Sequence, residues 1–146
     1  MKKKIGISSC LIGINCKYNG GSNLMDNLSL LEQKYDLIPI CPEVLGGLSI
    51  PRVPSEIVGN KVINKEGIDV TKNYIEGANK ALEILKENGI NEVILKSKSP
   101  SCGYKEIYDG TFSHRLIKAN GLACNLFLKN KIKIYTENDF LDLLNK

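Results

Sequence analysis

The chain has 146 residues, of which 42% are hydrophobic, and this length and composition suffice for one ordinary hydrophobic core. Its formal net charge of +4 comes from 20 basic and 16 acidic residues, an excess too small to indicate a nucleic-acid-binding protein. The apolar run near the amino terminus is too short for a signal peptide, and no apolar stretch is long enough to span a bilayer. We therefore expect one domain over residues 1–146, a cytoplasmic location and no membrane partner.

Short apolar stretches alternate along the chain with segments of helical periodicity. In chain order, the predicted elements are a strand at 4–9, a helix capped by Asp26, a strand at 36–40, a hairpin at 58–70, a helix from Asp69 or Thr71 to Asn88-Gly89, a strand at 92–95, a helix at 121–130, a strand at 131–135 and a short helix after Thr136.

Strands that alternate with helices favour a parallel sheet with helices on both faces. The predicted fold class is therefore α/β, a three-layer sandwich with a mainly parallel sheet of about four to five strands. In such a sheet a ligand lies beyond the carboxyl ends of the strands, because loops from neighbouring strands converge there. Residues that directly follow strands are thus the first candidates for a functional site.

Five cysteines, at positions 10, 16, 41, 102 and 124, are the most informative residues. An odd number in a chain without an export signal does not indicate a disulfide framework. Cys10 ends the first predicted strand, Cys41 ends the second, and Cys102 lies in the polar turn after the third. We therefore expect these three thiols to meet at one crevice. Cys16 and Cys124 have no such placement, and we expect them to be packing residues.

The stretch CLIGINCKY at 10–18 superficially resembles the loop of small thiol phosphatases and arsenate reductases, in which an arginine follows the cysteine after five residues. Here Cys16 occupies the arginine position. Phosphoryl transfer needs a fixed guanidinium or an equivalent group on the equatorial oxygens, which a cysteine does not supply. Phosphatase chemistry is therefore not favoured.

Metal binding by three thiolates is the other chemistry open to these residues, and soft sulfur selects iron–sulfur clusters, zinc or Cu(I). The chain lacks a C-x-x-C pair, which argues against a zinc ribbon, and His114 is its only histidine. A cubane iron–sulfur cluster normally has four thiolate ligands, so three would leave one iron open to a substrate. From spacing alone, the conclusion is a three-cysteine metal site that could be catalytic.

Longer motifs surround these cysteines. They read SSCLIG at 8–13, KYNGG at 17–21, CPEVLGGLSIPRVPSEI at 41–57, LKSKSPSCG at 95–103 and YDGTFS at 108–113. In this order they resemble the motifs of the thiouracil desulfidase family, formerly a domain of unknown function. The resemblance covers essentially the whole chain, and the motifs that contain Cys41 and Cys102 are long and specific.

The resemblance implies a Rossmann-like single domain in which Cys10, Cys41 and Cys102 hold a 4Fe-4S cluster with one open iron. It implies an enzyme, a desulfidase of the C–S hydrolase type, that removes sulfur from thiouracil or 4-thiouridine monophosphate without net redox change. The thiocarbonyl sulfur would bind the open iron, water would attack the activated ring carbon, and the sulfur would leave as sulfide.

Proton transfer in this reaction needs a positioned acid–base group. Glu43 follows Cys41 by two residues and is the first candidate, with Ser99 or Ser101 beside Cys102 as an orienting or relay group. Glu43 could instead cap a helix or pair with Arg52.

The remaining motif residues leave alternatives open. Arg52 could pair with Glu56 or face an anionic group of the substrate. His114 departs from the family pattern, in which a small residue commonly follows the serine of DGTFS.

Two other functions are open besides the desulfidase: an iron–sulfur sulfide carrier or donor, and a structural metal-binding module. The expected partner is a small thiopyrimidine or thionucleotide and not a nucleic acid, and the chain could be a monomer or a homodimer.

Overall fold

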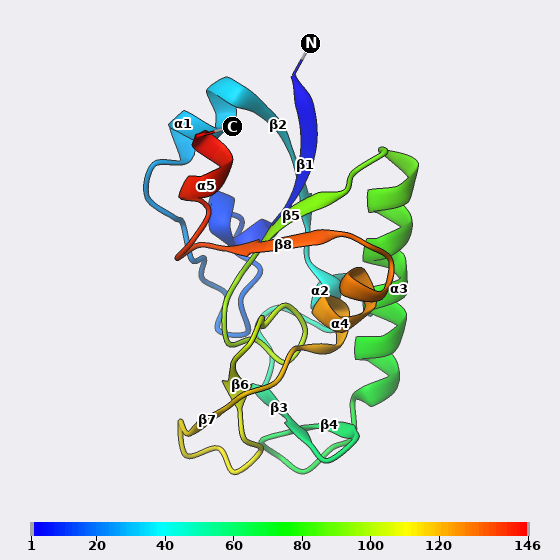
Figure 1. The fold of residues 1–146 in the computed structure, drawn as a ribbon. Coiled ribbons are helices and arrows are strands. Elements are labelled where there is room, and N and C mark those ends of the chain that lie inside the picture. Colours follow the sequence, from blue (N-terminus) through cyan, green and yellow to red (C-terminus); the bar gives the residue numbers. More distant parts are fainter. Residues whose placement is uncertain (1, 146) are drawn as a thin grey trace.

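A four-stranded parallel sheet forms the centre of the protein. The structure is a computed structural model, and it describes residues 2–145. The strand order is β2-β1-β5-β8, and every neighbouring pair is parallel (Figure 1). The four strands are β1 (Lys3–Ser8), β2 (Tyr35–Ile40), β5 (Glu92–Leu95) and β8 (Lys133–Thr136). The predicted parallel sheet is confirmed, and each strand lies within two residues of its predicted position.

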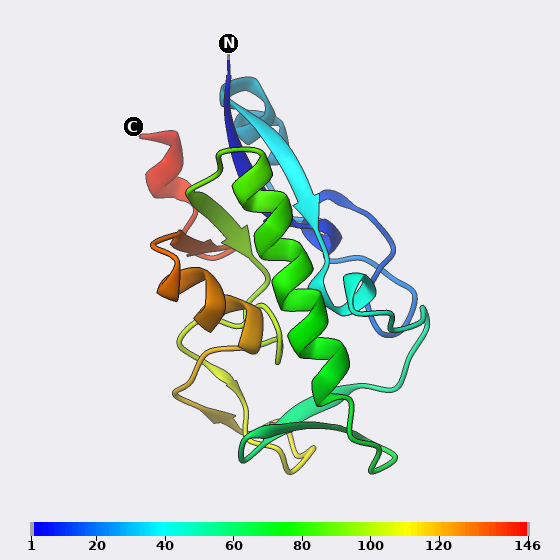
Figure 2. The ribbon, with the colours of Figure 1, turned by 90° about the vertical axis from the view of Figure 1, so that its right-hand side faces the viewer.

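Two helices, α3 (Thr71–Glu87) and α4 (Leu122–Lys129), cover one face of this sheet (Figure 2). Their apolar sides share one core with the strands, in which Leu85 of α3 and Phe127 of α4 pack near Val93 and are completely buried. α3 begins at Thr71, which confirms the predicted start of this helix, and Asp69 accepts a 2.9 Å hydrogen bond from the backbone nitrogen of Thr71.

Three shorter helices cover the opposite face: η1 (Ser9–Ile12), α1 (Leu28–Lys34) and α5 (Leu141–Leu144). They share a second core with the sheet that includes Ile7, Leu31 and Leu143, all with no exposed surface. The three-layer α/β architecture is therefore confirmed.

Two small antiparallel ribbons lie beyond the carboxyl ends of the sheet strands (Figure 1). The first joins β3 (Ser55–Val58) to β4 (Lys61–Asn64), and the second joins β6 (Ile107–Tyr108) to β7 (Leu116–Ile117). The hairpin predicted at 58–70 thus lies further toward the amino terminus, because its turn is at Gly59-Asn60. A second turn, at Gly67, adds only a bridge between Ile63 and Asp69.

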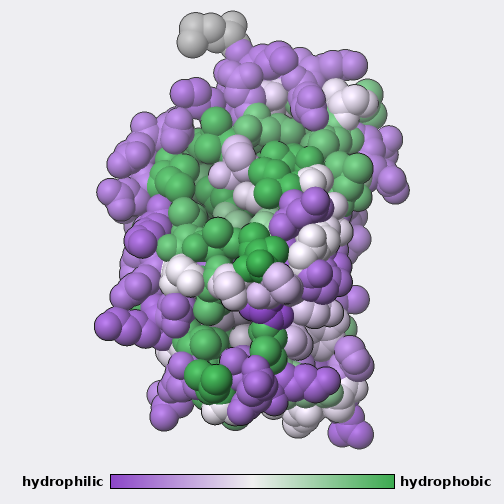
Figure 3. Space-filling model, turned by 180° about the vertical axis from the view of Figure 1, so that it is seen from behind, coloured by the Kyte–Doolittle hydropathy of each residue, from purple (hydrophilic) through white to green (hydrophobic). Residues whose placement is uncertain are grey.

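The edge strand β2 lies on the side of the molecule that Figure 3 shows, where apolar residues gather within a polar surround. Pro39 in β2 has no backbone N–H to donate, and proline in a sheet is confined to such edges. Among residues 2–145, no helix has the length and apolarity needed to cross a membrane.

Candidate functional site

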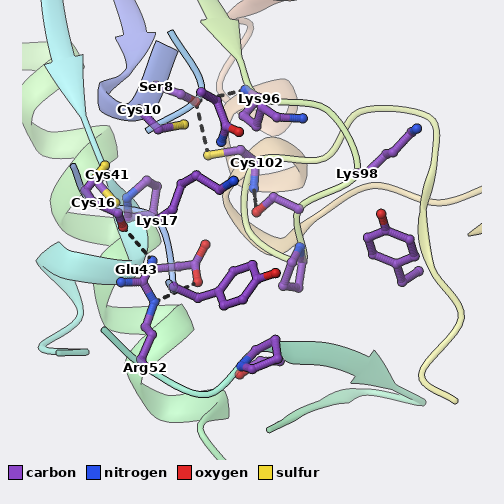
Figure 4. A pocket seen from close by; sticks show the side chains of 18 of the residues that line it. Ser8, Cys10, Cys16, Lys17, Cys41, Glu43, Arg52, Lys96, Lys98 and Cys102 are labelled. Carbon is purple, nitrogen blue, oxygen red and sulfur yellow. Dashed lines mark hydrogen bonds and ion pairs between the residues drawn. The ribbon is translucent and has the colours of Figure 1, made fainter. Parts of the chain in front are cut away.

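A cavity of about 720 Å³ opens at the carboxyl ends of the sheet strands, where the ribbons face the sheet. Cys10, Cys41 and Cys102 all line it, although they are far apart in the sequence (Figure 4). The structure thus brings together the three thiols that follow β1, β2 and β5.

Hydrogen bonds with two serine side chains hold Cys102 in place at the carboxyl end of the sheet. Ser99 Oγ accepts hydrogen bonds from the backbone nitrogens of Ser101, at 3.0 Å, and Cys102, at 3.1 Å. Ser8, at the end of β1, donates from its Oγ to the Cys102 sulfur at 3.4 Å and accepts from the backbone nitrogen of Lys96 at 2.9 Å. These bonds join the end of β1 to the turn that carries Cys102.

A backbone contact between two helices fixes Cys41. The thiol directly precedes α2 (Pro42–Leu45), which starts with Pro42, a residue suited to the first helical turn. A Cβ added at Gly77 of α3 would lie 1.8 Å from the Pro42 carbonyl oxygen, and one added at Gly46 would lie 1.9 Å from that of Asn73. Only glycine at these two positions allows α2 to lie so close to α3.

Cys16 also lines the cavity, whereas the sequence predicts a packing role for it. Its thiol is within hydrogen-bond contact of both Cys10 and Cys41. The hydrogen bond from Cys16 lowers the pKa of Cys10 to about 7 and also lowers the pKa of Cys41. The same two bonds raise the pKa of Cys16, because its protonated form is the donor. Cys10 and Cys41 are thereby favoured as thiolates.

Burial raises the pKa of the other two thiols, those of Cys102 and Cys124. It raises the pKa of Cys102 well above its ordinary value, although the Ser8 hydrogen bond opposes this shift. Cys124 is a residue of α4 with no exposed surface, and burial raises its pKa to about 12. The packing role predicted for Cys124 fits this position.

Glu43 lies at the cavity in α2, two residues after Cys41 (Figure 4). Its Oε1 accepts a 2.8 Å hydrogen bond from the Tyr74 hydroxyl and a 3.3 Å bond from Arg52 Nε. Arg52 also donates from Nη2 to the Cys16 carbonyl oxygen at 2.9 Å, so it joins the two loops that carry Glu43 and Cys16. Arg52 therefore pairs with Glu43, and among residues 2–145 it forms no ion pair with Glu56, the other acidic partner considered from the sequence.

Tyr74 is a site residue that the sequence analysis does not identify. It is almost completely buried in α3, and burial, followed by the nearby charge of Glu43, raises its pKa well above the ordinary value. Its spacing places it among the apolar residues of the helix, so the sequence alone gives it a core position.

The two candidate serines occupy different environments. Ser99 lines the cavity. Ser101 is completely buried, is not among the residues that line the cavity, and its Oγ has no hydrogen-bond partner among residues 2–145. The Ser101 carbonyl oxygen accepts from the backbone nitrogens of Ala123 and Cys124 at the start of α4.

Several cations line the same cavity, including Lys17, Lys65, Lys96 and Lys98. Lys96 pairs with Glu137 at 2.9 Å, whereas the other three lysines form no ion pair within the part of the chain that the structure describes. His114 lies on the cavity lining as well.

Comparison with known proteins identifies the family of the chain. Residues 5–139 match the family model described as 2-thiouracil desulfurase. The chain belongs to the 2-thiouracil desulfurase family. It is 40% identical over 148 residues to the uncharacterized protein YbbK of Bacillus subtilis (strain 168). The aligned region covers 94% of this chain and 98% of YbbK.

A solved structure has the same fold. It is that of the 4Fe-4S-dependent thiouracil desulfidase TudS, which superposes with a TM-score of 0.90 at 36% identity, over 99% of this chain and 96% of TudS. The desulfurase family resemblance and the fold class predicted from the sequence are both confirmed.

The donor set of the cavity suits an iron–sulfur cluster. Thiolates are the ligands that hold such clusters, and several thiols from separate loops line one cavity here. Among residues 2–145, no three Cys, His, Asp or Glu side chains form a ready-made site for a single metal ion. The fit therefore rests on the chemistry of the donors and on the cavity that they share.

Proposed function

We propose that this protein is an iron–sulfur-dependent enzyme that removes the sulfur of a thiolated pyrimidine without net oxidation or reduction. The observation that carries the proposal is the presence of Cys10, Cys41, Cys102 and Glu43 on one cavity. Family membership and the similarity to TudS support the same reaction.

In this proposal, Cys10, Cys41 and Cys102 hold a 4Fe-4S cluster. With three protein ligands, the cluster when bound would offer one open iron as a soft Lewis acid for the substrate sulfur. Ser8 would keep Cys102 oriented through its hydrogen bond to that sulfur, and Cys16 would favour the thiolate forms of the other two ligands.

The reaction balances without an external oxidant or reductant. Water adds its oxygen to the thiocarbonyl carbon, the carbon–sulfur bond breaks, and the bonding electron pair leaves with the sulfur as sulfide. A base must take a proton from the water, and the natural candidate is the Glu43 carboxylate on the cavity wall.

Arg52 and Tyr74 would hold this carboxylate in place. Both donate to Oε1 of Glu43, so the second oxygen can face the water and receive its proton. Ser99 would orient the turn that carries Cys102, because its oxygen accepts two backbone N–H bonds there. For Ser101, burial away from the cavity favours a structural role over a catalytic one.

The substrate that we propose is a thionucleotide monophosphate such as 4-thiouridine monophosphate, in preference to the bare base. Lys17, Lys65 and Lys98 line the cavity without an ion pair in the described residues, and a phosphate could bind among them. Phosphate binding would supply energy that orients the ring.

A sulfide carrier is the alternative function. A carrier needs only the open iron, whereas the paired carboxylate of Glu43, held by two donors on the same cavity, is what an acid–base catalyst requires. This arrangement favours the enzyme.

The test is anaerobic reconstitution of the protein, followed by measurement of sulfide released from a panel of thiouracils, thionucleotides and thiolated tRNA. We expect the reconstituted protein to release sulfide from a small thiopyrimidine or thionucleotide, and the cluster-free protein to release none. Release from thiolated tRNA alone, or from no member of the panel, would contradict the proposal.

A further inference from the structure

Glu56 is a buried acidic residue on the cavity, and it accepts hydrogen bonds from the backbone of a loop that is distant in the sequence. It is 8% exposed, and among residues 2–145 it forms no ion pair. Its Oε1 accepts hydrogen bonds from the backbone nitrogens of Gly110, at 3.0 Å, and Phe112, at 3.1 Å. Desolvation destabilises a carboxylate buried in this way, and the hydrogen bonds from its two N–H partners offset this effect in part.

The loop that Glu56 binds, residues 108–114, forms an aromatic wall of the cavity. Tyr108, Phe112 and His114 all line the cavity. The rings of Tyr108 and His114 meet edge to face with their centroids 6.0 Å apart. Such side chains offer flat aromatic faces on which a pyrimidine ring can stack.

The backbone of this loop needs support from outside the loop. Phe112 has a φ of 57°, a left-handed conformation that a bulky residue rarely adopts, and His114 has a φ of 63°, which is less unusual for histidine. Gly110 has a φ of 93°, and a Cβ there would lie 2.6 Å from the Ile57 carbonyl oxygen of β3. Unfavourable conformations of this kind persist only where surrounding contacts hold them. Two of these residues, Gly110 and Phe112, donate their backbone N–H groups to Glu56.

We propose that Glu56 is a positioning residue that fixes the 108–114 loop as the wall against which the pyrimidine ring of the substrate stacks. This inference rests on the proposed function for the identity of the ligand. Glu56 acts through the loop, so its loss should weaken substrate binding more than it slows the chemical step.

Three single variants and one double variant separate the loss of the Glu56 acceptor from the loss of its charge and from the loss of a ring of the wall. Glu56→Ala removes the acceptor, Glu56→Gln keeps an oxygen acceptor while losing the charge, and Phe112→Ala removes one ring of the wall. We expect Glu56→Ala to raise KM about tenfold with kcat nearly unchanged, the scale of a lost stacking contact. Glu56→Gln should restore most of the wild-type KM. The double variant Glu56→Ala/Phe112→Ala should have a KM no higher than that of the poorer single variant, because both changes remove the same contact.

Backbone amide hydrogen exchange tests the loop without any substrate. The amides of Gly110 and Phe112 should exchange at least about tenfold faster in Glu56→Ala than in wild type, because their acceptor is gone. Glu92→Ala is the matched control, since Glu92 is also a buried acid, 5% exposed, but lies in β5 and does not line the cavity. It should lower stability without changing exchange in the loop or KM.

Wild-type exchange at residues 110 and 112 in Glu56→Ala, or an unchanged KM, would overturn the inference. So would a Glu56→Gln variant as impaired as Glu56→Ala, because the charge and not the acceptor would then matter. If wild-type protein turned over no thiopyrimidine, the proposed function would fail, while the exchange measurement would still decide whether Glu56 holds the loop.

Discussion

The carboxylate of Glu43 is the residue on which the proposed proton transfer depends. Glu43→Gln preserves the size of the side chain and an acceptor for Tyr74 and Arg52, but an amide does not take up the proton of water. We predict that this variant keeps its cluster and binds substrate, yet turns over about a hundredfold or more slowly, the usual scale of a lost acid–base group.

Steady-state sulfide release and iron content check this prediction together. Ser101→Ala is the companion variant, and its effect on turnover should be smaller because its hydroxyl does not line the cavity. If Glu43→Gln with an intact cluster worked at the wild-type rate, Glu43 would be only a structural partner of Arg52.

The cysteines give a second prediction at the same scale. Replacement of Cys10, Cys41 or Cys102 by alanine should abolish the iron–sulfur absorbance after reconstitution, because two thiolates retain a cubane poorly. Cys16→Ala and Cys124→Ala should keep it, the latter because its thiol lies in the core away from the cavity. A Cys41→Ala protein that still held four irons per chain would remove Cys41 from the ligand set.

The sequence predicts the convergence of three thiols, because Cys10 and Cys41 end predicted strands and Cys102 lies in the turn after the third. It predicts the proximity of Glu43 because Glu43 follows Cys41 by two residues. Ser8 and Tyr74 are different. Both reach the site through contacts between segments distant in the chain, Ser8 to Cys102 and Tyr74 to Glu43. Cys16 likewise meets Cys10 and Cys41 only because a loop folds back, and spacing alone does not contain that information.

At the scale of elements, the contact between α2 and α3 determines where Cys41 and Glu43 lie. We predict that Gly77→Ala destabilises the cluster-free protein by about 1–3 kcal/mol, the typical cost of overpacking, because the new Cβ would meet the Pro42 carbonyl oxygen. The forced separation of the two helices should also reduce the iron retained after reconstitution.

Thermal unfolding and iron analysis test this, with Glu76→Ala as the control. Glu76 is exposed on the same helix, and alanine has the higher helix propensity, so stability should not fall. A Gly77→Ala protein that unfolds at the wild-type temperature and holds a full cluster would show that the helix contact does not position the site.

The elements differ in how far the sequence predicts them. Buried strands and the long helix α3 have strong apolar patterns, and they appear close to their predicted bounds. The two-residue strands β6 and β7 are too short to have a periodicity, and their pairing depends on the turn between them. The hairpin of β3 and β4 is displaced because two glycine turns compete within 58–70, and the sequence does not show which one closes the ribbon.

At the scale of the whole molecule, the positive charge is modest, but part of it is placed on the cavity. We predict that a thionucleotide monophosphate has a kcat/KM about tenfold above that of the bare base at low salt, the equivalent of one hydrogen bond to a charged group. Added salt should reduce this advantage, since it screens exposed lysines. Equal efficiency of nucleotide and base at low salt would argue against a phosphate site among Lys17, Lys65 and Lys98.

The most direct measurement follows sulfide and the oxygenated pyrimidine together, per mole of anaerobically reconstituted chain, with excess thiopyrimidine substrate. If the cavity of Cys10, Cys41, Cys102 and Glu43 is a catalytic desulfuration site, the two products should form in equal amounts and far exceed the amount of cluster. Neither product should form with the Cys41→Ala protein. A single burst of sulfide that stops at one equivalent per cluster would identify a carrier instead, and product formation by the cluster-free chain would contradict the role of the thiols.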